Sequence, residues 1–187
     1  MTQGRLDLRG RRPTNGYRGK RALDLALVLT AAPLWVPLVV VLCVVVAATV
    51  GRPVLYRQAR SGRGGRPFDV LKLRTMTDAR GPDGALLPDA QRLTPAGRRL
   101  RDWSLDELPQ LWSVLRGDMS VVGPRPLHVR YVDRYSARHR RRHEVRPGLT
   151  GLAQVAGRNA IDWTTRLDLD VEYVERASFR LDLAILF

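Results

Sequence analysis

The longest hydrophobic segment of the chain lies near its N-terminus. From Leu25 to Gly51 its 27 residues carry no formal charge and are mostly valine, leucine and alanine. A run of about 18 or more such residues is typical of a membrane helix, whereas the apolar part of a signal peptide is roughly 7–15 residues long. Pro33 and Pro37 lie in its first half. Each proline removes a backbone donor and costs about 3 kcal/mol inside a helix, so the pair predicts a break near Ala32-Pro33.

Both flanks of this segment are basic. Seven lysines and arginines precede it between residues 5 and 21, and five arginines follow it between residues 52 and 66. Positive residues favour the cytoplasmic side of a membrane, so both flanks are compatible with one face. Two topologies remain open on local sequence: a re-entrant helix–break–helix and a single span with a proline kink. Residues 1–16 are rich in Arg, Gly and Pro and predict a flexible basic tail on an anionic membrane surface.

Alternating apolar residues after this segment indicate β-structure. Residues 53–60 and 68–76 are two extended runs, separated by the glycine-rich residues 61–67. This pattern is typical of a β-hairpin with a longer loop. Residues 77–90 follow as a loop rich in Asp, Gly and Pro.

Helical patterns dominate the rest of the chain. We expect a short basic helix over 94–102, with Thr94 as its N-cap and Pro95 at the first helical position. Further helices are expected from Ser104 to about Arg116, from Leu127 to His143 and from Asp162 to about Ala177, with a glycine-rich loop over 147–158. The predicted fold class is α+β and mainly helical: an N-terminal membrane helix–break–helix, then a small cytosolic domain with a β-hairpin and amphipathic interfacial helices.

The chain carries a formal charge of +14, and all but two of its 32 basic residues are arginine. This balance implies an anionic partner: nucleic acid, anionic lipid or a phosphorylated substrate. Cys43, the only cysteine, lies in the apolar run, which excludes an internal disulfide and a cysteine-based zinc cluster. His139 and His143 flank three arginines, so a solvated basic face is expected there rather than a metal site.

Two adjacent carboxylates, Asp106 and Glu107, stand out in this cationic chain. Ser104 and Glu107 form the Ser-x-x-Glu pattern of a capping box, in which Glu107 closes the start of its helix and Asp106 complements the helix dipole. Spacing alone favours this structural interpretation. A chemical role is compatible with it, because a helix start favours an ionised Asp106, and a charged carboxylate can attack phosphorus or bind Mg²⁺.

Basic side chains near this pair in sequence are candidates for phosphate contacts. Arg101 lies five residues before Asp106, and Lys72 and Arg74 lie on the second expected strand. Arg125 stands between two prolines that stiffen its backbone, which makes it the best individual candidate. Guanidinium groups suit bidentate phosphate contact, although each of these residues is also explained as a solvated surface charge.

Five blocks of sequence occur in a fixed order. They are Lys20-Arg21-x-x-Asp24, Phe68-x-x-x-Lys72-x-Arg74-x-Met76, Ser104 through Leu111, Gly117 through Pro126, and Arg146 through Gly157-Arg158. In this order they resemble the bacterial sugar transferases of the monotopic phosphoglycosyl transferase superfamily. The resemblance covers roughly residues 17–187.

The resemblance implies an enzyme that transfers a sugar-1-phosphate from a UDP-sugar to polyprenol (undecaprenyl) phosphate and releases UMP. Asp106 matches the family's nucleophile, which forms a phosphosugar-aspartyl intermediate, and Glu107 completes the Asp-Glu dyad. Mg²⁺ is the expected cofactor, bound by Asp106 with Glu107 as a possible second ligand. Arg101 matches a position that contacts lipid phosphate. Further phosphate or substrate contacts are expected from Lys72, Arg74, Arg125 and Arg158.

The resemblance also favours the re-entrant topology, with residues 17–52 as the membrane helix and residues 53–187 as a catalytic domain on the cytoplasmic face of the bacterial inner membrane. The family's break at a Ser-Pro pair corresponds to Ala32-Pro33, where the serine is absent. Such enzymes initiate exopolysaccharide, O-antigen, capsule or glycoprotein glycan assembly. The alternative is a non-enzymatic, membrane-anchored module that binds nucleic acid or anionic lipid. It rests on charge alone, and no nucleic-acid partner is expected, because the sequence offers no recognisable nucleic-acid fold or aromatic stacking platform.

Overall fold

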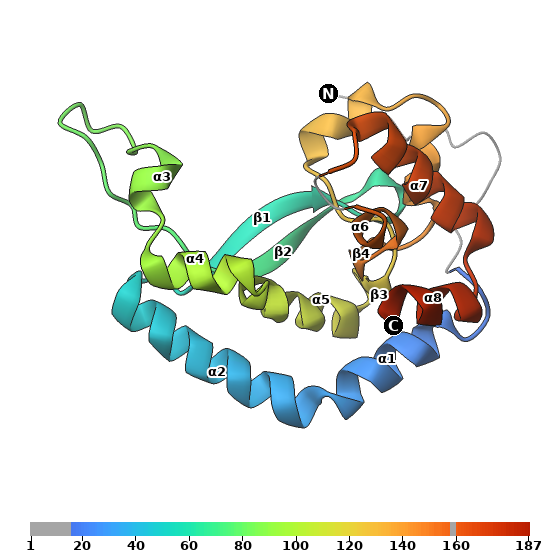
Figure 1. Cartoon of the computed structure of the whole chain (residues 1–187), viewed down its shortest axis with the longest axis horizontal. Helices are drawn as coiled ribbons and strands as arrows, with labels where there is room; N and C mark the ends of the chain where they lie inside the picture. Colours follow the sequence, from blue (N-terminus) through green and yellow to red (C-terminus); the bar gives the residue numbers. More distant parts are fainter. Residues whose placement is uncertain (1–15, 158–159) are drawn as a thin grey trace. The chain divides into compact units, whose positions relative to one another are not determined.

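The structure is a computed structural model that describes residues 16–157 and 160–187. The predicted basic tail, apart from Gly16, and Arg158 therefore lie outside the described residues. The chain folds as two compact units, each discontinuous in sequence (Figure 1). Unit 1 comprises Met1–Val28, Ala59–Asp69 and Ser113–Phe187, and unit 2 comprises Leu29–Gln58 and Val70–Trp112.

The apolar segment forms two helices, α1 (Lys20–Thr30) and α2 (Ala32–Thr49), interrupted at Ala31. The interruption directly precedes the predicted break at Ala32-Pro33. Pro33 lies in the first turn of α2, where its missing N–H costs little, and the helix continues through Pro37. Among the described residues, α2 is the one helix long and apolar enough to cross a membrane by length and composition, which suggests membrane association.

One side of α2 forms the core of unit 2. Leu42, Val46 and Val50, spaced four apart, are buried against Leu73 and Leu100. Most of the remaining side of α2 is apolar and exposed. Its most exposed large side chains are Leu34, Val44 and Val40, at 78%, 66% and 60%.

The predicted hairpin is present. Strand β1 (Leu55–Ser61) pairs with β2 (Pro67–Leu73), and the short 3₁₀ turn η1 (Arg63–Gly65) joins them. A connection this short requires antiparallel strands. Helix α3 (Asp89–Arg92) and helix α4 (Pro95–Asp102) follow in unit 2. Thr94 caps α4 as predicted, because its side chain accepts a hydrogen bond from the Gly97 amide at 2.9 Å.

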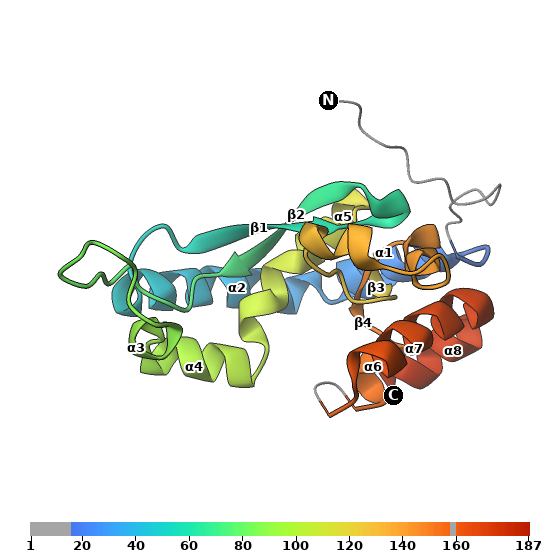
Figure 2. The ribbon, with the colours of Figure 1, turned by 90° about the horizontal axis from the view of Figure 1, so that it is seen from above.

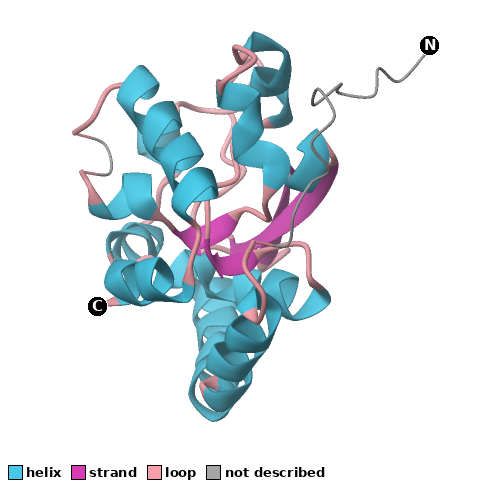
Figure 3. Cartoon of the chain, turned by 90° about the vertical axis from the view of Figure 1, so that its right-hand side faces the viewer, coloured by secondary structure: helices cyan, strands magenta, loops and turns pink. Residues whose placement is uncertain are grey.

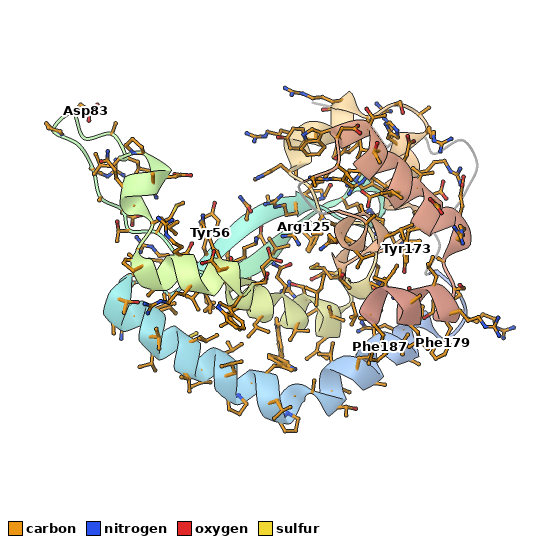
Figure 4. All side chains as sticks on the ribbon, viewed as in Figure 1. Tyr56, Asp83, Arg125, Tyr173, Phe179 and Phe187 are labelled. Atoms are coloured by element: carbon orange, nitrogen blue, oxygen red, sulfur yellow. The ribbon has the colours of Figure 1, made fainter. Side chains whose placement is uncertain are left out.

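Unit 1 contains a second small sheet and the C-terminal helices. Strands β3 (Ser120–Val122) and β4 (Gly148–Thr150) pair in parallel, and α6 (Leu152–Val155) follows them. Helices α7 (Trp163–Arg176) and α8 (Phe179–Leu186) lie side by side in both views (Figures 1 and 2). Tyr173 on α7 fixes this packing: its hydroxyl lies 2.8 Å from Asp182 Oδ1 on α8 and 3.0 Å from the Val122 carbonyl (Figure 4).

Helix α1 is tied to α8 by a buried ion cluster. Lys20 Nζ lies 2.6 Å from Asp182 Oδ2 and 3.4 Å from Asp24 Oδ1. Asp24 also accepts hydrogen bonds from Ser120 Oγ and the Val121 amide. Asp24 is thus ion-paired, and its carboxylate is fully buried within unit 1.

The prediction of one helix from Leu127 to His143 is wrong. The segment forms two 3₁₀ turns, η3 (Val129–Arg134) and η4 (His139–Glu144), separated by extended backbone at Tyr135. A continuous α-helix would place Arg130, Arg134, Arg138 and Arg142 four residues apart on one face, where like charges repel.

The prediction of a solvated basic face around His139 and His143 is also wrong for Arg142 and His143, which are buried. Arg142 is buried and donates to Asp170 at 2.7 and 3.0 Å. His143 is buried too, with Nε2 3.2 Å from Ser61 Oγ. Burial, followed by the charge of Arg142, lowers the pKa of His143 to about 3, so the ring is neutral.

The C-terminal elements differ in part from the expected ones. The glycine-rich stretch over 147–158 contains β4 and α6, and α7 begins after Asp162 as predicted, with that side chain accepting from two backbone amides. Helix α8 was not predicted, although Ser178 caps it in the usual way. The mainly helical α+β class with small sheets is confirmed (Figure 3).

Candidate active site

Unit 2 brings together four of the residues singled out in the sequence. Lys72 lies on β2, Arg101 lies in the last turn of α4, and Asp106 and Glu107 lie on the 3₁₀ segment η2 (Leu105–Gln110). Helix α5 (Leu111–Arg116) continues from η2. The predicted single helix over 104–116 is therefore two elements.

The predicted capping box is wrong. Ser104 has φ 55° and ψ 21°, in the left-handed region, and its side chain makes no capping hydrogen bond. The reason is the end of α4: the Ser104 amide donates to the Arg101 carbonyl at 3.0 Å, so this residue terminates the preceding helix. The Glu107 amide then donates to the Ser104 carbonyl at 3.2 Å, which starts η2 as a 3₁₀ turn. The Glu107 carboxylate is thereby available for another partner.

That partner is Lys72. Its Nζ lies 2.7 Å from Glu107 Oε1, and both side chains are about one fifth exposed. The pair joins β2 to η2, so it fixes the carboxylate next to Asp106 and supplies a cation at the same place. Because both charged groups keep some contact with water, their loss of hydration costs less than in a fully buried ion pair. Their attraction and hydrogen bond offset that cost more readily.

Asp106 is buried, at 8% exposed. Burial is the largest influence on its carboxyl group and raises its pKa. The positive charge of Lys72 opposes this shift, the negative charge of Glu107 adds to it, and Arg101 opposes it more weakly. Asp106 is therefore a carboxylate with little water around it, beside a second carboxylate and two cations.

Apolar neighbours hold the carboxylates in this position. Leu105 and Leu108, on either side of the pair in sequence, pack against the core formed by α2, Leu73 and Leu100. The apolar helix and the segment that carries Asp106 therefore share one core within unit 2. Sequence reasoning identified α2 and the acidic pair separately but did not link them.

Arg101 is positioned by a residue that the sequence reasoning missed. Its Nε donates to Thr75 Oγ1 at 2.9 Å, while the rest of the residue is exposed. Thr75 directly follows the matching Lys-x-Arg block, and nothing in its type or spacing marked it as a partner. Gly97 permits the arrangement, because a Cβ there would lie 2.0 Å from the Thr75 carbonyl oxygen.

Arg74 has mainly structural partners. It donates to the carbonyls of Arg52 at 2.6 Å and Met76 at 2.8 Å, and it pairs with Asp78 at 2.6 Å. These bonds hold the end of β2, so the guanidinium has less capacity left for phosphate than predicted.

Arg125 belongs to unit 1 (Figure 4). Its carbonyl accepts a hydrogen bond from Arg142 at 2.6 Å, which fixes the Pro-flanked loop from behind. Arg158, the remaining predicted substrate contact, lies outside the described residues.

The donor set of unit 2 fits a hard cation. Mg²⁺ is usually held by one or two carboxylates together with substrate phosphates and waters. Asp106 and Glu107 supply that number, and the raised pKa of Asp106 indicates a site where a bound cation would favour the ionised form. Among the described residues, no cluster of three or more metal-binding side chains occurs. The residues thus fit a metal shared with a phosphate ligand rather than a closed protein cage.

The chain is similar in sequence to several known bacterial proteins. The chain is 55% identical over 142 residues to EpsL of Bacillus subtilis (strain 168), named an uncharacterized sugar transferase, a match covering 76% of this chain and 70% of the relative. It is 44% identical over 176 residues to the UDP-glucose:undecaprenyl-phosphate glucose-1-phosphate transferase of Caulobacter vibrioides, covering 89% and 66%. It is 37% identical over 193 residues to the exopolysaccharide production protein ExoY of Rhizobium meliloti, covering 94% and 85%.

Other relatives are longer. The chain spans 39% of the UDP-galactose-lipid carrier transferase of Erwinia amylovora, to which it is 40% identical, and just under two thirds of the Caulobacter protein. Residues 16–187 match the family described as Bacterial sugar transferase. Since that match covers every described residue, this chain belongs to the bacterial sugar transferase family.

Proposed function

We propose that the chain transfers a sugar-1-phosphate from a UDP-sugar to polyprenol phosphate, releasing UMP, with Asp106 as the nucleophile. The observation that carries the proposal is the buried Asp106 carboxyl beside the Glu107–Lys72 pair, on a segment that shares its core with α2. The names of the Caulobacter relative and of a 35% identical Aeromonas hydrophila protein, an N-acetylgalactosaminephosphotransferase acting on undecaprenyl phosphate, support the substrate classes.

In the first step, an Asp106 carboxylate oxygen attacks the phosphorus that carries the sugar. A new P–O bond forms, the bond from that phosphorus to the bridging oxygen breaks, and UMP leaves with the electron pair. Burial removes the hydration that would otherwise shield the carboxylate, while Lys72 and Arg101 offset the repulsion between carboxylate and phosphate.

In the second step, an oxygen of polyprenol phosphate attacks the same phosphorus. The aspartyl P–O bond breaks, which restores the Asp106 carboxylate and yields polyprenyl diphosphate-sugar. Glu107 assists activation of the acceptor, and Arg101, exposed beyond its Thr75 contact, binds the acceptor phosphate. Asp106 and Glu107 would hold Mg²⁺, whose charge would offset that of the phosphates.

Covalent labelling tests the nucleophile. UDP-sugar labelled in the phosphate next to the sugar, given without acceptor, should label the wild-type protein and the Glu107→Gln variant but not Asp106→Asn. Asp102→Asn is the matched control, because Asp102 is an exposed carboxylate in the last turn of α4. Labelling of Asp106→Asn at the wild-type level would show that another residue is the nucleophile.

We further propose that α1 and α2 form a re-entrant membrane element, with the catalytic residues on the cytoplasmic face of the bacterial inner membrane. The interruption at Ala31 and the basic residues on both flanks support this topology. In a Cys43→Ser background, Arg18→Cys and Arg57→Cys replace exposed residues on either side. Both should resist a membrane-impermeant thiol reagent in intact cells, whereas reaction at one of them alone would mean a span.

The sugar differs among the relatives, whose names specify glucose or N-acetylgalactosamine phosphates. We therefore propose a UDP-linked hexose or N-acetylhexosamine as the donor. UMP release measured across a panel of UDP-sugars identifies the donor, and release from none of them would refute the donor class.

A further inference from the structure

The ion pair between Lys72 and Glu107 conflicts with the separate roles expected of its two members. Lys72 is a candidate contact for phosphate, yet its Nζ lies 2.7 Å from Glu107 Oε1. Glu107 is a candidate metal ligand beside Asp106, yet the same pair occupies one of its two carboxylate oxygens. While the pair is closed, the ammonium is bonded to the protein itself, and that oxygen is taken by a cation of the protein.

The two adjacent carboxylates need a positive charge near them. Asp106 is buried, and burial raises the pKa of its carboxyl group, as does the negative charge of Glu107. The charge of Lys72 lowers this pKa, and it does so more than the charge of Arg101. The Arg101 Nε is directed to Thr75 Oγ1, at 2.9 Å. Lys72 is therefore the main counterion that the fold supplies to these carboxylates.

A divalent cation at the carboxylates would take over the task of Lys72. An ammonium and Mg²⁺ on the same carboxylate lie close together, and like charges repel strongly where little water separates them. Mg²⁺ also needs its ligand oxygens in nearly octahedral positions, which leaves little freedom to keep an ammonium on one of them. Lys72 can move away, because its side chain is about one fifth exposed and its four-carbon stem is flexible. The closed pair and a metal on Glu107 are thus competing states of one site.

We propose that Lys72 is a built-in counterion that occupies Glu107 until Mg²⁺ binds, and that its displacement frees the ammonium for the phosphates of the donor. The inference rests on the proposed function for the metal ion and the donor. Lys72 is then a positioning residue: it holds the Glu107 carboxylate in place before the metal binds, and it sets the metal concentration at which the pair opens. Lys72, Asp106 and Glu107 all belong to unit 2.

The lysine content of the chain allows this displacement to be measured directly. Lys20 and Lys72 are its only lysines, and Lys20 is 6% exposed and bound to two carboxylates. Brief acetylation of the full-length protein, followed by peptide mass spectrometry, should modify Lys72 several-fold faster at saturating Mg²⁺ than without it. Loss of the ion pair and a neighbouring dication both favour the neutral, reactive amine. Lys20 should keep its rate, and potassium chloride at matched ionic strength should change neither rate.

Metal affinity gives an independent measurement. In calorimetric titration without substrate, Lys72→Met should bind Mg²⁺ about tenfold more tightly than the wild type, because the competing cation is gone. Lys72→Arg keeps a cation and should stay near the wild-type affinity. Arg98→Met is the matched control, since Arg98 is an exposed cation on α4, and its affinity should stay within about twofold of wild type. Glu107→Gln should make acetylation of Lys72 fast with and without Mg²⁺.

The outcomes separate this inference from the proposed reaction. An acetylation rate of Lys72 that Mg²⁺ leaves unchanged overturns the inference, even if a UDP-sugar labels the wild type and not Asp106→Asn. Equal or weaker Mg²⁺ binding in Lys72→Met overturns it as well. Faster acetylation with Mg²⁺ and tighter binding in Lys72→Met, in a protein that no UDP-sugar labels, support the counterion role and refute the reaction.

Discussion

Gly97→Ala tests how α4 positions Arg101. Helix propensity alone predicts that alanine inside a helix stabilises by about 1 kcal/mol relative to glycine. The structure predicts the opposite, because the new Cβ would lie 2.0 Å from the Thr75 carbonyl oxygen, whereas ordinary contact begins at 3.4 Å. Helix α4 and the end of β2 must separate by about 1.4 Å, a change of the size produced by overpacking a core, which costs about 1–3 kcal/mol.

The separation also reaches the site. Arg101 lies one turn after Gly97, and its 2.9 Å bond to Thr75 Oγ1 would lengthen beyond hydrogen-bond distance. Thermal unfolding followed by tryptophan fluorescence should show a melting temperature lower by about 2–4 °C per kcal/mol lost. UMP release should need a higher polyprenol phosphate concentration. Arg98→Ala, at the neighbouring exposed position, should leave both measurements near wild type. A Gly97→Ala protein as stable as wild type would show that α4 does not pack against Thr75 as described.

Three further predictions concern charge. The proposed nucleophile Asp106 would attack as the carboxylate, so kcat/KM should rise with pH through its raised pKa. Glu107→Gln should move this acid limb to lower pH and Lys72→Met to higher pH, and shifts in the same direction would refute the assignment. Lys20→Met leaves the buried carboxylates of Asp24 and Asp182 without their cation and should lower the free energy of unfolding by about 3–5 kcal/mol. Denaturant titration measures this loss, and a loss below about 1 kcal/mol would contradict the buried ion cluster. His143 has a folded pKa of about 3, below its unfolded value of 6.5, so its contribution to stability is present above pH 6.5 and is lost as pH falls toward 3. His143→Gln should therefore make the melting temperature depend less steeply on pH between 6.5 and 3. An unchanged slope would mean that the ring is not buried in its neutral form.

Local sequence signals predicted the elements that local interactions determine. The hairpin followed from its alternation and glycines, and α4 followed from Thr94 and Pro95, whose effects reach only a few residues. Ser104 shows the limit of this reasoning. A serine three residues before a glutamate suits a capping box, but the end of α4 lies only two residues earlier and takes Ser104 into a left-handed conformation. Two overlapping signals competed, and the C-terminal one prevailed.

The residues whose partners are distant in sequence were less predictable. Asp106 and Glu107 were identified, yet their surroundings depend on Lys72 and on leucines that meet α2. Arg142 looked like one more solvated arginine, and only Asp170, 28 residues away, explains its burial. Composition could indicate an anionic ligand, but it could not indicate which of so many arginines would be buried and which would pair.

The shared core of unit 2 limits how such a protein can be rebuilt. Leu42, Val46 and Val50 contact the same leucines that hold the Asp106 segment, so the hydrophobic helix is not an interchangeable tether. A shortened chain lacking it would expose Leu73 and Leu100 to water and leave the segment that carries Asp106 without its support. Transplanting the anchor of a distant relative would require matching leucines on both sides of the contact. Sequence variation in α2 and in η2 should therefore be correlated among family members.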